Sequence, residues 1–444
     1  MAEIVTSKKA CSVNPLKMSQ PIGAALAFLG MDRSVPLLHG SQGCTAFGLV
    51  LFVRHFRETI PLQTTAMSEI TTILGGLDNI EQALLNIHKR ANPALIGLCT
   101  TGITEARGDD VVGFLKLIRE RHPELAGMDV VCVPTPDFES GFELGWGKAV
   151  RCMIEQLARP SDVRQLRQIN ILPSCHQTPG DIEELREIIE AFGLTAVILP
   201  DLSGSLDGHI PENFLPHTLG GTTRAQVSSL GESALTIAIG EHMRPAAEAL
   251  HKIAGVPFEV LDRLTGLLPC DALIALLARV SGNPVPAKIK RQRSQLQDAM
   301  LDSHFYFSGK KVAIGAEPDL LWSIGQLLAD MGCEIAAAVT TVPATHLQGL
   351  PAAQVLVGDL EDLEARAQGC DLLVTHSHGR QMAERLDLPF LRLGIPTFDR
   401  LGAAHRVSVG YRGTRNLIFE AGNLFIANQH DATPADWPVL AAAH

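Results

Sequence analysis

The chain has 444 residues, 46% of them hydrophobic and 19% charged, and a formal net charge of −11 at pH 7. This length suits about three domains of about 150 residues each, and the acidic charge excludes a sequence-independent nucleic-acid binder, which needs a basic surface. Residues 1–14 lack the apolar core of a secretory signal, and the apolar stretch 22–31 is too short to cross a bilayer. We therefore expect a cytoplasmic protein with no membrane segment and no nucleic-acid partner.

Short apolar runs without polar alternation recur along the chain, as is typical of parallel strands that are covered on both faces. Helical patterns lie between many of them. The clearest, 181–192, has acidic residues in its first turn, apolar residues on one side and Gly193 directly behind it; another spans 318–331. This alternation predicts an α/β fold with parallel sheets. The predicted strands are 94–98, 130–133, 169–172, 196–199, 312–314, 335–339, 355–357, 372–374 and 390–393.

Two stretches interrupt this pattern and mark domain boundaries. Residues 157–168 are polar and precede a new strand, whereas 281–297 contains two prolines and the basic run 288–293. We interpret that run as the solvated face of a helix; the alternative is a docking surface for an acidic partner. The chain is thereby predicted to form three Rossmann-like domains, which span 1–160, 161–300 and 301–444.

The usual signatures of nucleotide binding and side-chain catalysis do not occur. There is no GxxxxGK[ST] loop and no GxGxxG between a strand and a helix, so the sequence gives no sign of ATP or dinucleotide binding. Local motifs also assemble no Ser–His–Asp or Cys–His arrangement. The sequence therefore does not support a reaction carried out by this chain's own side chains.

Three polar pairs at element ends are weighed as minor candidates. His376 and His378, like Cys175-His176, follow predicted strands, where α/β proteins place ligand-contacting residues. No neighbouring residue completes a metal site, so we expect polar contacts near a domain cleft instead. The pair at 109–110, two aspartates, is interpreted as a helix cap.

The nine cysteines are scattered without a CxxC pair, which excludes a disulfide framework and favours a reducing compartment. Most are expected to be small apolar residues in or beside buried strands. Cys44 differs because it ends the small-residue loop 39–44, His-Gly-Ser-Gln-Gly-Cys, where a bulky inorganic group can approach. An iron–sulfur cube takes four thiolates, and the next cysteine along the chain is Cys99. The loop therefore predicts a cluster that this chain holds only in part.

Segments along nearly the whole chain resemble nitrogenase component 1 and its relatives. The His-Gly-x-x-Gly-Cys element at 39–44 is the most specific, because its cysteine is a cluster ligand in that family. The resemblance implies the family's three-domain α/β fold. The other similar segments are 14–17, 20–24, 54–58, 67–69, 75–76, 100–105, 108–110, 136–138, 141, 304–305 and 309–311.

Two departures indicate which member of the family the chain resembles. The catalytic β subunit is similar but carries two further cluster cysteines, which align with Leu62 and Gly102 here. Neither residue can ligate iron, so the chain resembles the β-like half of the family's cofactor-assembly scaffold. Cys44 is then its metal ligand, and an α-like partner supplies the other three thiolates of a [4Fe–4S] cluster. Cys99 is the alternative ligand, although its position at a strand end favours the core.

The resemblance implies a scaffold for biosynthesis of the iron–molybdenum cofactor. The chain would pair with a NifE-like α subunit in an α2β2 heterotetramer, with its N-terminal arm and Cys44 loop at the interface. A transient precursor, delivered by NifB or a carrier, would be held mainly by the partner while molybdenum and homocitrate are added, and the iron protein NifH would dock. Three alternatives stay open. One is a working nitrogenase β subunit, which would need cysteines where Leu62 and Gly102 stand. The others are a subunit of a dark-operative protochlorophyllide reductase-like enzyme and a non-metal binding module on the same fold.

Overall fold

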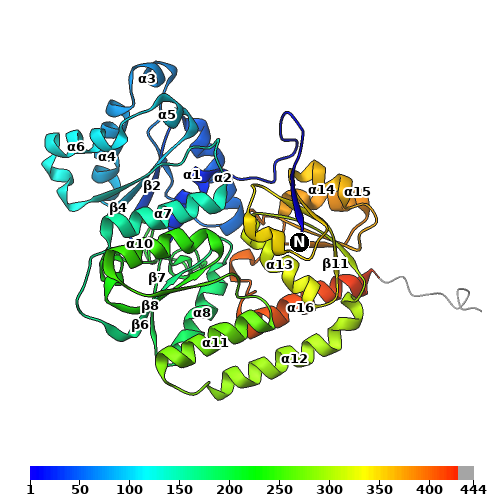
Figure 1. The fold of residues 1–444 in the computed structure, drawn as a ribbon. Helices are drawn as coiled ribbons and strands as arrows, with labels where there is room; N and C mark the ends of the chain where they lie inside the picture. Colours follow the sequence, from blue (N-terminus) through cyan, green and yellow to red (C-terminus); the bar gives the residue numbers. More distant parts are fainter. Residues whose placement is uncertain (429–444) are drawn as a thin grey trace, which may run out of the picture.

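The computed structural model describes residues 1–428, which form three α/β units, each built around its own parallel sheet (Figure 1). The predicted α/β class with parallel sheets is confirmed, and all nine predicted strands occur, with bounds that differ by a few residues. Residues 429–444 of the predicted third domain lie outside the described residues. None of the helices in residues 1–428 combines the length and apolar character that crossing a membrane requires.

The first unit contains a four-stranded sheet in the order β3-β2-β4-β5. Its elements are α1 (Gln20–Leu29), β2 (Ser34–His39), α2 (Gln42–Phe56), β3 (Gln63–Thr64), α3 (Glu69–Leu74), α4 (Leu77–Ala91), β4 (Leu95–Thr100), α5 (Gly102–Arg107), α6 (Val111–Arg121), β5 (Asp129–Val133) and α7 (Phe142–Leu157). Strand β2 was not predicted because Pro36 interrupts its apolar run, and proline is disfavoured inside sheets. His39 pairs in register with Thr100, so the loops that follow β2 and β4 meet at one edge of the sheet.

Helices α1 and α7 of the first unit cross at glycine contacts. A Cβ atom on Gly23 would lie 2.0 Å from the carbonyl oxygen of Phe142, and one on Gly145 would lie 2.0 Å from that of Gln20. Only glycine permits so close a backbone approach. The crossing anchors the N-terminal end of α7, which faces the other two units.

The second unit contains a sheet in the order β7-β6-β8-β9. Its elements are β6 (Gln165–Leu172), α8 (Pro179–Ala191), β7 (Thr195–Ile198), α9 (Arg224–Ser228), β8 (Ser233–Ile239), α10 (Arg244–Ala254), β9 (Phe258–Leu261) and α11 (Leu267–Ser281). Strand β8 was not predicted because polar residues interrupt it. Inside the sheet, Asn170 satisfies two of them: its Nδ2 donates to Thr236 Oγ1 at 3.1 Å, and Ser233 Oγ donates to its Oδ1 at 2.6 Å.

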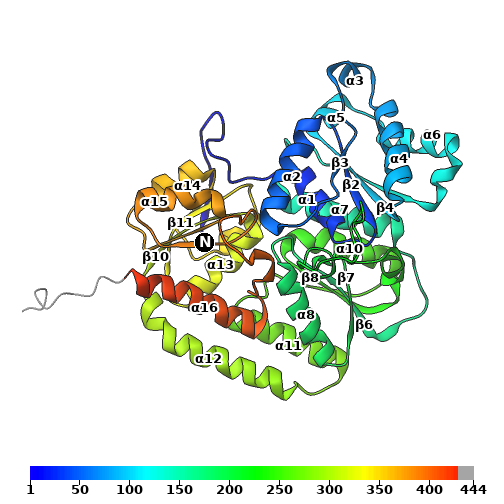
Figure 2. The same cartoon turned by 180° about the vertical axis from the view of Figure 1, so that it is seen from behind.

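The third unit contains a six-stranded sheet in the order β1-β12-β11-β10-β13-β14. Its elements are β1 (Glu3–Thr6), β10 (Lys311–Ala316), α13 (Pro318–Asp330), β11 (Glu334–Thr340), β12 (Gln354–Val357), α14 (Leu360–Arg366), β13 (Leu372–Thr375), α15 (Arg380–Leu386), β14 (Phe390–Arg392) and α16 (Gly410–Ala427). Strand β1 corrects the predicted 1–160 domain, because it forms the edge of this sheet by pairing with β12. The N-terminus accordingly lies at the third unit in Figures 1 and 2. The four residues of β1 have no neighbouring strand in sequence, and the edge of a sheet offers the free backbone N–H and C=O groups with which they pair.

Helix α12 (Ala287–Phe307) connects the second unit to the third and lies alongside α16 (Figures 1 and 2). It contains the basic run, of which Lys288, Lys290 and Arg291 are exposed. Arg293 instead turns to α11, where its Nη2 donates to Asp271 Oδ2 at 2.7 Å. The run is therefore a largely solvated helix face, as predicted.

Candidate cluster-ligand site at Cys44

Cys44 lies in the first turn of α2, directly after the loop that leaves β2. Its side chain is exposed, and its Sγ lies 3.6 Å from Oγ of Ser41, the N-cap residue. The positive end of a helix dipole favours negative charge at this position. The thiol therefore faces outward, at a helix end that suits an anionic ligand group.

The loop before Cys44 is pressed against the start of α5. Thr101 Oγ1 donates to the carbonyl oxygen of His39 at 2.9 Å, and Thr104 Oγ1 does so at 3.3 Å. A Cβ atom on Gly40 would lie 2.5 Å from Thr101 Oγ1, so this glycine is needed for the contact. The packing sets where α2 begins and hence where Cys44 points.

His39 is buried beneath the same loop and is held by two polar groups. Its Nδ1 lies 3.0 Å from Thr65 Oγ1, and its Nε2 lies 3.4 Å from Asp109 Oδ2. Burial lowers the pKa of His39, although the charge of Asp109 opposes the shift. Asp110 caps α6, as expected of the pair, by accepting from Gly113 N at 2.9 Å. Asp109 is instead the buried partner of His39 and Arg107.

Cys44 lines a cavity of about 640 Å³ between α2, the N-terminal arm (residues 7–19, between β1 and α1) and the loop after β13. Lys17 contributes a positive charge to its wall, and His376 and His378 reach it from the third unit. His376 Nε2 contacts the carbonyl oxygen of Leu16 at 3.4 Å, and burial lowers the pKa of this histidine to about 4. The two histidines, predicted to make polar contacts near a domain cleft, thus lie at the Cys44 cavity.

No other cysteine within residues 1–428 lines this cavity. Cys99 is buried in β4 and burial raises its pKa, which supports a core residue. Cys11 departs from the expected burial, because it is exposed on the N-terminal arm. A cavity with one thiol can supply one ligand of a cluster that is shared between chains. It cannot supply the four thiolates of a complete cluster site.

Helix α2 also presents an apolar stripe that sequence reasoning did not single out. Phe47, Val50 and Val53 are 67%, 56% and 41% exposed. Their spacing of three residues places them along one side of the helix, and Phe47 lines the cavity beside Cys44. Contiguous exposed apolar groups of this kind mark interaction surfaces.

The family described as nitrogenase component 1 type oxidoreductase matches residues 19–426. The chain belongs to this family. Its relatives include proteins named nitrogenase iron-molybdenum cofactor biosynthesis protein NifN. The chain is 56% identical to that of Bradyrhizobium diazoefficiens, over 98% of this chain and 95% of the relative, and 42% identical to that of Klebsiella pneumoniae, over 97% and 94%. The expected likeness to the members of the family that assemble the cofactor is thereby confirmed.

Solved structures of the nitrogenase component 1 family share this fold. One chain of nitrogenase Cp1 at pH 6.5 has a TM-score of 0.92 and 30% identity, covering 99% of this chain and 98% of its own length. A chain of nitrogenase Cp1 at pH 5 has a TM-score of 0.72 and 14% identity, which shows the fold alone.

The two positions that the family resemblance singled out are ordinary structural residues here. Leu62 is buried, and its Cδ2 lies 3.3 Å from where a Cβ on Gly48 would stand. Gly102 begins α5, and its backbone N donates to Asp137 Oδ2 at 3.4 Å. Neither offers a sulfur atom, so Cys44 is alone in this part of the chain.

Proposed function

We propose that this chain is a NifN-type subunit of the scaffold on which the iron–molybdenum cofactor of nitrogenase is assembled. The observation that carries the proposal is the exposed thiol of Cys44, with no second cysteine of the described residues in its cavity, in a chain 56% identical to a protein named for that biosynthesis. The relatives' names favour this function over a protochlorophyllide reductase-like enzyme or a non-metal binding module.

The partner is a NifE-like α subunit, which binds over Cys44 in an α2β2 complex. The stripe Phe47, Val50 and Val53 supports this placement, because an apolar helix face next to a lone cluster ligand gains burial when a second chain covers it. The N-terminal arm also lines the cavity and contributes to the interface. The complex works in the cytoplasm.

The group shared across that interface is a [4Fe–4S] cluster, with Cys44 as one ligand and three thiolates from the partner. When bound, it supplies one-electron transfer. This chain's residues position the thiolate at the N-terminus of α2 and place Lys17 near the negative charge of thiolate-bound iron. The NifB-derived precursor is held mainly by the partner, and NifH docks to the complex.

The test is metal analysis of the chain co-expressed with its α-like partner. We expect Cys44→Ala to remove the iron and the electron paramagnetic resonance signal of the shared cluster while the chain still folds. Cys11→Ala is the matched control, because Cys11 is also exposed but lies outside the cavity. An unchanged cluster signal in Cys44→Ala, or a full cluster on the chain expressed alone, would contradict the proposal.

A further inference from the structure

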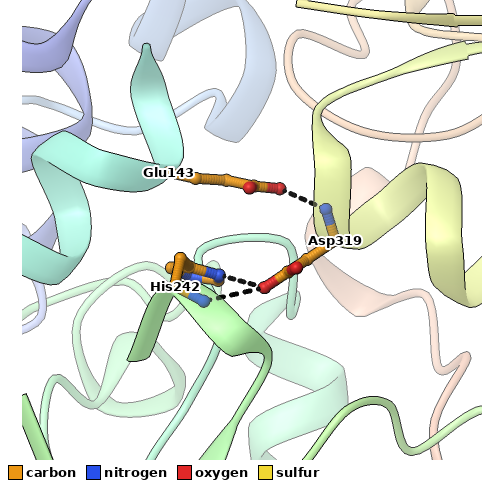
Figure 3. Close-up of side chains that lie close together, drawn as sticks. All are labelled: Glu143, His242 and Asp319. Atoms are coloured by element: carbon orange, nitrogen blue, oxygen red, sulfur yellow. Dashed lines mark hydrogen bonds and ion pairs between the residues drawn. The ribbon is translucent and has the colours of Figure 1, made fainter. Parts of the chain in front are cut away.

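A second group of possible metal ligands lies where the three units meet, apart from Cys44. Glu143 comes from the first turn of α7, His242 from the turn η4 (Glu241–Met243) after β8, and Asp319 from the first turn of α13 (Figure 3). One ligand atom from each of the three lies within 4.8 Å of the others. Each unit therefore contributes one side chain to a single small space.

The three side chains already contact one another. His242 Nδ1 lies 2.5 Å from Asp319 Oδ2, and Glu143 Oε1 accepts from the backbone N of Asp319 at 2.8 Å (Figure 3). Two further histidines hold the carboxylates from outside: His176 Nε2 lies 2.7 Å from Glu143 Oε1, and His346 Nε2 lies 3.0 Å from Asp319 Oδ1. Metal-binding carboxylates are commonly oriented by such outer partners.

The group is buried, and within the described residues the close basic partners of its carboxyl groups are histidines. Glu143 and Asp319 are each 5% exposed, and Glu317, at the N-cap of α13, is 6% exposed. Within residues 1–428, no lysine or arginine nitrogen lies within 4.0 Å of an oxygen of these three carboxylates. Buried carboxylates without a cation carry a large desolvation cost.

Three buried polar atoms around the group lack hydrogen-bond partners. One is Nε2 of His346, whose 3.0 Å contact with Asp319 is not aligned for a hydrogen bond. Glu317 Oε2 accepts from Thr341 Oγ1 at 2.6 Å, but its Oε1 has no partner. Nδ1 of His176 has none either. Unpaired buried acceptors are rare in folded proteins, and such atoms are satisfied by bound water or by an ion.

We propose that Glu143, His242 and Asp319 bind one divalent transition-metal ion of the zinc or manganese class, which links the three α/β units. Two carboxylate oxygens and one imidazole nitrogen suit such an ion. The ion takes the place of the hydrogen between His242 Nδ1 and Asp319 Oδ2. That hydrogen moves to Nε2 of the same ring, which in the metal-free chain accepts weakly from the backbone N of Cys175, at 3.5 Å. Adjacent space of about 110 Å³, lined by His176 and Asp319, leaves room for water to complete the coordination.

The test is equilibrium dialysis of the full chain, in complex with its partner, against Zn²⁺ and separately Mn²⁺ after chelator treatment. We expect one additional ion per chain and at least ~10-fold weaker binding for Glu143→Gln and for Asp319→Asn. Glu139→Gln is the matched control, because Glu139 lies near the start of α7 but its side chain is 57% exposed. Cys44→Ala keeps the ion even where the shared cluster is lost, so the two proposals fail independently.

Equal binding by the wild type and the Glu143→Gln and Asp319→Asn variants would overturn the proposal. If those variants fail to fold, anomalous diffraction from wild-type crystals soaked in Zn²⁺ decides. A peak between the three side chains supports the site, and its absence there overturns it.

Discussion

Replacing Gly40 by alanine tests whether close packing holds the loop before Cys44. A Cβ atom there would lie 2.5 Å from Oγ1 and 2.9 Å from Cγ2 of Thr101. Because both distances are shorter than van der Waals contact, the loop must move, and the hydrogen bond from Thr101 Oγ1 to His39 is lost. Overpacking costs about 1–3 kcal/mol and the lost hydrogen bond about 0.5–1.5 kcal/mol. We therefore expect the free energy of unfolding to fall by ~2–4 kcal/mol.

Gly43→Ala is the matched substitution in the same loop. A Cβ atom on Gly43 would meet only Ser41 Oγ, at 3.9 Å. Because alanine is favoured over glycine in a helical turn by ~0.5–1 kcal/mol, we expect unchanged or slightly higher stability. Urea unfolding of the purified chain, followed by circular dichroism, measures both variants. Iron lost from the Gly43→Ala complex without lost stability would indicate that Gly43 leaves room for the cluster or the partner.

If the free energy of unfolding of Gly40→Ala lies within ~0.5 kcal/mol of the wild type, the range of neutral surface substitutions, then close packing at Gly40 does not hold the loop. A double variant adds a second criterion. Thr101→Ala removes the atom closest to the new methyl group, so the cost of Gly40→Ala must be smaller in that background. If the stability losses of Gly40→Ala and Thr101→Ala simply add, contact with Thr101 is not the cause of the loss in Gly40→Ala.

We expect Phe47→Lys to prevent co-purification with the α-like partner while the chain still folds. Leu166→Lys, at a leucine of β6 that is 75% exposed, leaves co-purification intact. Gly23→Ala places a methyl group 2.0 Å from the Phe142 carbonyl oxygen and is expected to cost ~3 kcal/mol in urea unfolding. Its control, Gly127→Ala, meets no atom within 4 Å and stays within ~0.5 kcal/mol. Burial, together with the charge of Asp319, raises the pKa of Glu143 to about 8. Between the ordinary carboxyl pKa and about pH 8, the folded metal-free chain therefore binds more protons than the unfolded chain. Its stability therefore falls from pH 6.5 to 8, by ~1 kcal/mol per pH unit, and Glu143→Gln flattens this slope; a steeper slope in the variant would contradict the assignment.

Strands and helices were predictable where the signal is local. Apolar runs such as 94–98 and 372–374 became the buried parallel strands β4 and β13, because a strand covered on both faces needs apolar residues throughout. The failures have local causes as well. Strand β2 was missed because Pro36 interrupts its apolar run. Strand β8 was missed because its serine and threonine are polar, and the sequence does not show that Asn170 forms hydrogen bonds with them inside the sheet.

The sequence by itself determined the family, the α/β class and the isolation of Cys44, because these depend on residue types and their order. The tertiary structure alone decided which distant segments meet. It placed β1 on the sheet of the third unit and left the stripe on α2 uncovered. It also brought Asp319 to Glu143, 176 residues earlier, and to His242, 77 residues earlier. Such convergence depends on how three separately folded units pack, and periodicity within one segment carries no information about that packing.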